Sequence, residues 1–112
     1  MSIVVNLAIF PMDKKDHLSP YVARSLRVIE ASGLPYQLGP MGMAIEGGYD
    51  EVMAVVRDCF TAMAADCDRV YLSLSMDYRK DGEGRIQGKV GSVEQLLGND
   101  LSLTHAGQKP KG

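Results

Sequence analysis

The sequence contains no tryptophan, only two cysteines and two histidines, and no apolar run long enough to cross a bilayer. A transmembrane helix needs about 20 consecutive, mostly apolar residues, so we expect no membrane partner. The two histidines, His17 and His105, lie far apart in the chain, and neither has a second His or Cys at metal-ligand spacing. The sequence therefore predicts neither a membrane protein nor a metal centre, and no residue pattern calls for a cofactor.

An excess of basic charge is also missing. Lys and Arg total 12, Asp and Glu total 14, and the formal net charge is -2. Domains that bind nucleic acid are typically basic, with clustered Lys and Arg, so we expect no nucleic-acid partner. The glycines at 39–42 and 47–48 lack a full phosphate-binding fingerprint, and a turn explains them better. The composition is that of an ordinary soluble globular domain.

The two cysteines, Cys59 and Cys67, fall on one predicted helix about two turns apart. Their separation along the helix is roughly 12 Å, which is too far for a disulfide. No basic neighbour activates either thiol, apart from Arg69 near Cys67, so we interpret both as inert, reduced thiols. Because charges begin at Asp13 we expect no signal peptide, and the cytoplasm is the predicted compartment.

Hydrophobic periodicity predicts a strand, a helix, two strands, a helix and a strand, in that order. The expected strands span residues 3–10, 34–39, 43–47 and 69–79, and the second helix spans about 50–66. Ser19 and Pro20 are expected to open the first helix as N-cap and first helical residue, and Gly33 to end it. A turn at 81–84, a short strand at 85–90, a capped helix at 92–97 and a polar, flexible tail at 99–112 follow.

Each helix has an apolar stripe that should face the core. The stripe of the second helix is widened on its flanks. The stripe residues are Leu18, Val22, Leu26 and Ile29 in the first helix, and Val52, Val56, Cys59 and Met63, flanked by Met53, Val55 and Phe60, in the second.

This order of elements predicts an α+β, ferredoxin-like fold, built from two split βαβ units in a single domain over residues 1–98. Right-handed crossovers place both helices on one face of an antiparallel sheet and leave the other face bare. The bare face would be too apolar at its centre to be fully solvated, so we expect it to pack on another subunit. Its expected residues are Val4, Asn6, Ala8 and Phe10 beside Tyr71, Ser73, Ser75 and Asp77.

The candidate site lies on that bare face. Asn6, Glu46 and Asp77 should all point to it, from the central strand and the two strands beside it. Two carboxylates and an amide accept hydrogen bonds and balance positive charge, which suits a cationic or aminopyrimidine ligand. The alternative is a salt-bridge network between subunits, in which Arg79 and Lys89 neutralise the carboxylates. The residue types alone leave both interpretations open.

Several segments resemble the small thiamine-binding-protein family. They are the serine-led helix start at 19–22, Gly-Leu-Pro-Tyr-Gln-Leu-Gly-Pro-Met-Gly at 33–42, Ile-Glu-Gly at 45–47, Asp-Tyr-Arg at 77–79, and Lys89 with 92–93. The resemblance runs in order through residues 1–98, and its most specific part is the Pro-Met-Gly-x-x-Ile-Glu-Gly block. It implies ferredoxin-like subunits that pair into dimers and stack into tetramers. It also implies cytosolic binding of thiamine or its hydroxymethylpyrimidine moiety, with no established catalysis.

The same resemblance implies which residues contact the ligand. One position departs from the family pattern, because Met43 stands where the family usually has threonine after the turn glycine. The residues that match the family motifs, and that join Asn6 in the predicted site, are Ser19, Met41, Gly42, Glu46, Asp77, Arg79 and Lys89.

Two other functions stay open. One is a small cofactor-free enzyme acting on an aromatic or hydrophobic substrate, which rests on analogy of fold and would need a histidine or another base in a deep pocket. The other is a ligand-free module that only assembles with copies of itself or with a partner chain.

Overall fold

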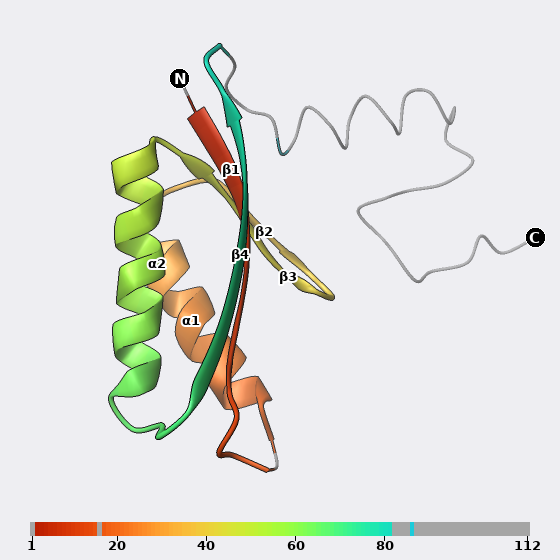
Figure 1. The fold of residues 1–112 in the computed structure, drawn as a ribbon, viewed down its shortest axis with the longest axis vertical. Coiled ribbons are helices and arrows are strands. Elements are labelled where there is room, and N and C mark those ends of the chain that lie inside the picture. Colours follow the sequence, from red (N-terminus) through yellow and green to blue (C-terminus); the bar gives the residue numbers. More distant parts are fainter. Residues whose placement is uncertain (1, 16, 82–85, 87–112) are drawn as a thin grey trace, which may run out of the picture.

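The computed structural model describes residues 2–15, 17–81 and 86, and it has the ferredoxin-like βαββαβ order (Figure 1). The four strands form one antiparallel sheet in the order β2-β3-β1-β4. The elements are β1 (Ser2–Pro11), α1 (Ser19–Ala31), β2 (Tyr36–Gly39), β3 (Gly42–Gly47), α2 (Tyr49–Ala64) and β4 (Val70–Arg79). The predicted fold class is confirmed, and no helix in the described ranges could span a membrane.

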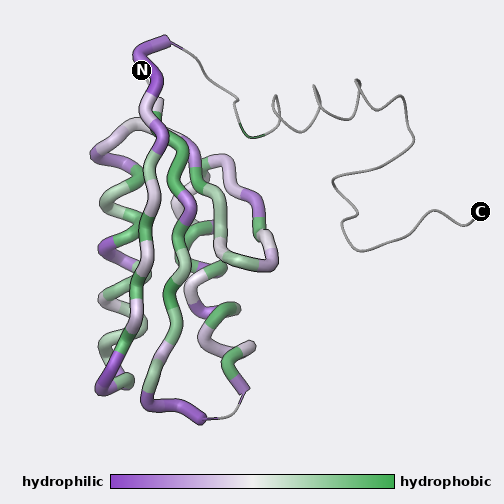
Figure 2. The backbone as a smooth tube through the Cα atoms, turned by 45° about the vertical axis from the view of Figure 1, so that its right-hand side comes forward, coloured by the Kyte–Doolittle hydropathy of each residue, from purple (hydrophilic) through white to green (hydrophobic). Residues whose placement is uncertain are grey.

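Both helices cover the same face of the sheet, as Figure 1 shows. The core lies between them and the sheet, and it is built from alternate residues of β1 and β3 together with one stripe of α2. Figure 2 shows that β1, the central strand, is hydrophobic over most of its length. The side chains that are less than 2% exposed include Ile3, Val5, Leu7, Ile45 and Val52. Period-two alternation in β1 and β3 therefore decides which side chains meet the helices.

The helix predictions were right in type and wrong in three details: the cap residue of α1, the burial of Phe60, and Leu18, which is 41% exposed rather than part of a core-facing stripe. Helix α1 is capped by Leu18 rather than by Ser19, and no side-chain cap bond is present, so Ser19 is already a helical residue. Gly33 follows the helix end with φ +76, as a C-terminal glycine should. In α2, Val55 joins the buried stripe, but Phe60 is about half exposed and is not a core residue.

Strand β1 is longer than its partner β3, and this difference shapes the molecule beside the hairpin. β1 pairs with β4 along its whole length, from Ser2 to Pro11. Its pairing with β3 ends at Leu7, opposite Met43, because the β2–β3 hairpin turns at residues 40–41. In the part of the chain that the structure describes, one edge of β1 therefore continues past the hairpin with no strand beside it.

Several predictions fall outside the described residues. These are the turn at 82–84, the helix at 92–97, the tail at 99–112 and most of the strand at 85–90. Of that last segment only Ile86 is described, and its backbone is helical rather than extended.

Candidate functional site

The helix-free side of the sheet carries the predicted site, and we call it the open face. Alternation in the strands places Glu46 and Asp77 on it, in register with Val4 of the central strand on either side. Two strand spacings separate the backbones of these carboxylates, or about 10 Å. The open face consists of Val4, Asn6, Ala8 and Phe10 of β1, Ala44 and Glu46 of β3, and Tyr71, Ser73, Ser75, Asp77 and Arg79 of β4.

Glu46 is a buried carboxylate within this face, with only 4% of its surface exposed. Its Oε1 accepts a hydrogen bond of 3.3 Å from the backbone N–H of Ile86, a residue that follows β4 in the chain. Its own backbone N–H donates to the carbonyl of Pro35, which ties β3 to the start of the hairpin. Ile86 therefore contacts the Glu46 carboxylate. This carboxylate is held in place by the fold rather than left in solvent.

Asn6 is the next residue of β1 after Val4 on the open face, and it packs against the hairpin turn. Gly42 has φ +149, and a Cβ there would lie 2.8 Å from both Asn6 Nδ2 and the Leu7 carbonyl oxygen. Only glycine fits this backbone, which lets the Asn6 amide sit directly on the turn. The structure thus brings together the predicted residues Asn6 and Gly42, which are 36 positions apart in the sequence.

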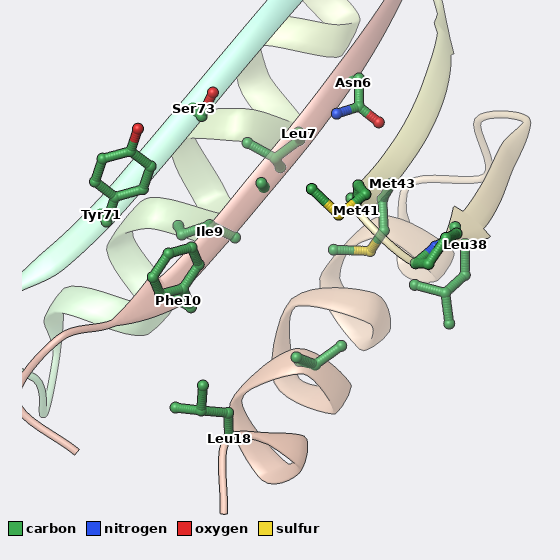
Figure 3. A pocket seen from close by; sticks show the side chains of 15 residues that line it. Asn6, Leu7, Ile9, Phe10, Leu18, Leu38, Met41, Met43, Tyr71 and Ser73 are labelled. Carbon is green, nitrogen blue, oxygen red and sulfur yellow. The ribbon is translucent and has the colours of Figure 1, made fainter. Parts of the chain in front are cut away.

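Two hollows meet at Asn6. A cavity of about 500 Å³ lies beyond the hairpin, beside the unpaired edge of β1, and we call it the edge cavity (Figure 3). Its walls include the α1 cap residue Leu18 and Val22 of α1, Met41 and Met43 of the hairpin, and the stacked pair Phe10 and Tyr71. A shallower hollow of about 350 Å³ lies on the open face itself, and its lining includes Asn6, Ala44, Ser75 and Asp77.

Four of the predicted ligand residues line these two hollows, and Glu46 lines neither. Met41 and Gly42 line the edge cavity, Asp77 lines the shallow hollow, and Asn6 lines both. Ser19 lines neither, although its neighbour Leu18 forms part of the edge-cavity wall. Arg79 is exposed at the far end of β4, in register with Ser2, and Lys89 lies outside the described residues.

Sequence reasoning missed the edge cavity. The signal that could have found it is the mismatch between a ten-residue β1 and a six-residue β3, together with a proline at the end of β1. Met43, which stands where the family usually has threonine, is only 4% exposed, lies on the helix-covered side of the sheet and contributes to the cavity wall.

The described cysteines have no activated thiol. Burial raises the pKa of the Cys59 thiol from 9.0 to about 11, and burial likewise raises the pKa of Cys67. Among the described residues, Cys59 Sγ contacts the Ser25 carbonyl and Cys67 Sγ contacts the Asp66 carboxylate. His17 lines neither hollow, and within the described ranges no three His, Cys, Asp or Glu side chains gather as metal ligands.

Comparison with known proteins gives a consistent result. Residues 5–94 match the family model described as thiamine-binding protein. The chain is 31% identical over 94 residues to the UPF0045 protein of Methanocaldococcus jannaschii, covering 84% of this chain and 94% of that one. It is 35% identical over 98 residues to the UPF0045 protein of Mycobacterium bovis, covering 87% and 96% respectively.

Solved structures agree with these sequence matches. The crystal structure of the M. jannaschii protein superposes with a TM-score of 0.76 at 30% identity, over 85% of this chain and 98% of that one. A candidate thiamine biosynthesis/salvage protein from Thermotoga maritima superposes with a TM-score of 0.74 at 25% identity, over 83% and 99%. The chain belongs to the thiamine-binding protein family.

Proposed function

We propose that this protein binds thiamine or its hydroxymethylpyrimidine moiety in the cytoplasm, as a carrier, buffer or sensor rather than as an enzyme. The observation that carries the proposal is the position of Asn6, Glu46 and Asp77 on one helix-free face, in a chain of the thiamine-binding family. Thiamine carries a positive charge on its thiazolium ring and an amine on its pyrimidine. Carboxylate and amide oxygens complement both groups.

The charge of the ligand fits the shallow hollow better than the edge cavity. Asp77 is exposed and lines the shallow hollow, and Glu46 lies buried on the same face, in register with Val4, without lining the hollow. None of the described residues that line the edge cavity carries a charged side chain. We therefore assign the thiazolium to the Asp77 side of Asn6, and the neutral half of the ligand to the Asn6 amide and the hairpin turn with Met41 and Gly42.

A non-catalytic role is favoured by the chemistry of the described residues. The enzyme alternative needs a general base in a deep pocket. The edge cavity has no His, Asp, Glu or Lys among its walls, and the Cys59 thiol, with its raised pKa of about 11, stays protonated at neutral pH. Binding without covalent chemistry is the simplest use of such a site.

We also propose that the open face packs on further copies of the chain, giving a dimer of dimers. A face that mixes Val4, Ala8 and Phe10 with Tyr71 is apolar enough to favour burial. Ser19, Arg79 and Lys89 would then complete the site at or near contacts between subunits. Light scattering should give the mass of a tetramer, and a monomer at micromolar concentration would contradict this part of the proposal.

Titration calorimetry tests the proposed ligand directly. The protein should bind thiamine and hydroxymethylpyrimidine, and Asp77→Asn should weaken thiamine binding by about two- to fivefold, as expected for the loss of an exposed charge pair with the thiazolium, which has no N–H to donate. The same variant should affect the neutral pyrimidine less, because it lacks the thiazolium charge. Asp58→Asn, an exposed carboxylate on α2, is the matched control and should change neither affinity.

Two results would contradict the proposal. One is the absence of heat and of a thermal shift with either compound at millimolar concentration. The other is an equal loss of affinity in Asp58→Asn and Asp77→Asn, which would point to a general effect of net charge rather than to a site.

A further inference from the structure

Two backbone hydrogen bonds fix the direction in which the residues along the exposed edge of β1 point their N–H and C=O groups. In an antiparallel ladder, alternate residues direct both N–H and C=O to the same neighbouring strand. The Met12 N–H donates to the Arg69 carbonyl, so the even residues of β1 face β4. The Glu46 N–H donates to the Pro35 carbonyl, so the even residues of β3 face β2 and its odd residues face β1. The odd residues of β1 therefore direct their backbone groups toward β3.

The backbone N–H and C=O of Ile9 point to the same side as those of Leu7, but β3 does not extend that far. Pairing between β1 and β3 stops at Leu7, and Ile9 is the next odd residue along the strand. Its N–H and C=O point away from β4 into the edge cavity, which Ile9 also lines. No residue of the described chain pairs with Ile9 on that side. The edge cavity thus has a backbone donor and a backbone acceptor side by side in its wall.

The rest of the cavity is shaped for a flat, uncharged ring. Its volume of about 500 Å³ lies within the range of roughly 300 to 1,000 Å³ that is typical of small-molecule sites. Phe10 and Tyr71 form an aromatic pair with centroids 5.3 Å apart, and Met43 and Val22 supply aliphatic surface. Figure 3 shows Met41 on the hairpin, pointing across the gap toward β1.

We propose that the edge cavity binds a planar heteroaromatic molecule whose adjacent ring acceptor and amino donor pair with the N–H and C=O of Ile9. Such a ligand takes the place of the partner residue that β3 would supply if it were longer. The inference deepens the proposed function and rests on it in one respect: the aminopyrimidine ring belongs to this class. The main chain of Ile9 would then read the pyrimidine, while Asp77 meets the charged end.

Pro11 argues for a small molecule rather than a further strand. It is the next odd residue after Ile9, and it has no N–H to donate. The edge therefore offers one donor, at Ile9, where strand addition needs a repeating series of donors and acceptors. A proline whose nitrogen faces an open edge is also a common means of preventing strand addition.

The Ile9 amide reports on the proposal through amide NMR. In the ligand-free protein it should exchange with solvent faster than the amides of Ala8 and Phe10, which face β4. Adding 4-aminopyrimidine should shift the Ile9 amide and slow its exchange. The probe 4-methylpyrimidine has the same shape but no donor, and it should bind about two- to tenfold more weakly.

A variant pair tests the location. Met41→Trp places a larger side chain at the cavity mouth from a residue that is 82% exposed, so the fold should tolerate it. The substitution should weaken the binding of 4-aminopyrimidine by about fivefold or more, because the ligand would lose a hydrogen bond to Ile9 and the packing around it. Phe60→Trp, an exposed position on α2, is the matched control and should leave the affinity unchanged.

Three results would overturn the inference: an Ile9 amide that does not respond to 4-aminopyrimidine, an affinity that Met41→Trp leaves unchanged, or an Ile9 amide already protected without ligand. The last result would mean that another strand occupies the edge. None of these depends on the thiamine titrations. Thiamine binding with a silent Ile9 would leave the proposed function standing, and a responsive Ile9 without thiamine binding would leave this inference standing.

Discussion

The two faces of the sheet are formed by the same strands, but their side chains have different surroundings. On the covered face, Leu7 and Ile45 are fully buried against the helices. On the open face, their neighbours Asn6 and Ala44 line a hollow instead. Within the described residues the helices cover one face, whereas the open face presents polar groups and hollows that these residues do not fill. Stability should therefore depend mainly on the first face, and binding on the second.

The largest expected effect comes from comparing adjacent residues of β1. Leu7→Ala removes a fully buried side chain and should lower the free energy of unfolding by about 2 to 5 kcal/mol. Asn6→Ala, one residue away on the open face, should lower it by less than about 1 kcal/mol. Chemical denaturation measures both. Equal losses would mean that the open face contributes to the core as much as the covered face does.

The next effect concerns Gly42, at the turn between β2 and β3 on which Asn6 packs. Gly42→Ala should destabilise the protein by about 1 to 3 kcal/mol, because its backbone conformation is unfavourable and its Cβ meets the Leu7 carbonyl. Gly33→Ala also sits at a positive φ, but nothing lies within 4 Å of its Cβ, so it should cost less. Thermal unfolding ranks the two variants. A larger loss at Gly33 would contradict the close packing of Asn6 on the turn.

A smaller effect should appear only in alkaline solution and only from the covered face. The folded pKa of Cys59 is raised from 9.0 to about 11, so between these values the folded state holds a proton that the unfolded state has lost. The stabilising contribution is therefore complete below pH 9 and declines as pH rises toward 11. The difference in unfolding free energy between wild type and Cys59→Ala should shrink over this range. A constant difference would contradict the burial of the thiol.

The sequence predicted the covered face well because burial leaves a periodic record. Alternation in 69–79 and in 3–10 located β4 and β1 within two residues at each end, and helical spacing located both helices. Phe60 was the exception, since an apolar residue at a flank of the stripe need not reach the core. Ser19 was another, because helix α1 begins one residue earlier than its capping pattern suggested.

The open face was predictable only in part. Alternation and strand order correctly placed Asn6, Glu46 and Asp77 on the same side of the sheet, and their role in binding stays a prediction. The division into two hollows was not predictable, because it depends on where the hairpin turns relative to the end of β1. The burial of Glu46 under Ile86 depends on a contact between residues 40 positions apart, which no local pattern encodes.

One measurement tests the central claim most directly: a map of amide chemical-shift changes on adding thiamine to the labelled protein. We expect the changes to concentrate at Asn6, Ala44, Ser75 and Asp77 and at the β1 edge near Ile9. We expect amides of the buried α2 stripe, such as those of Val56 and Met63, to stay in place. Changes confined to α1 and α2, with the open face silent, would contradict the account.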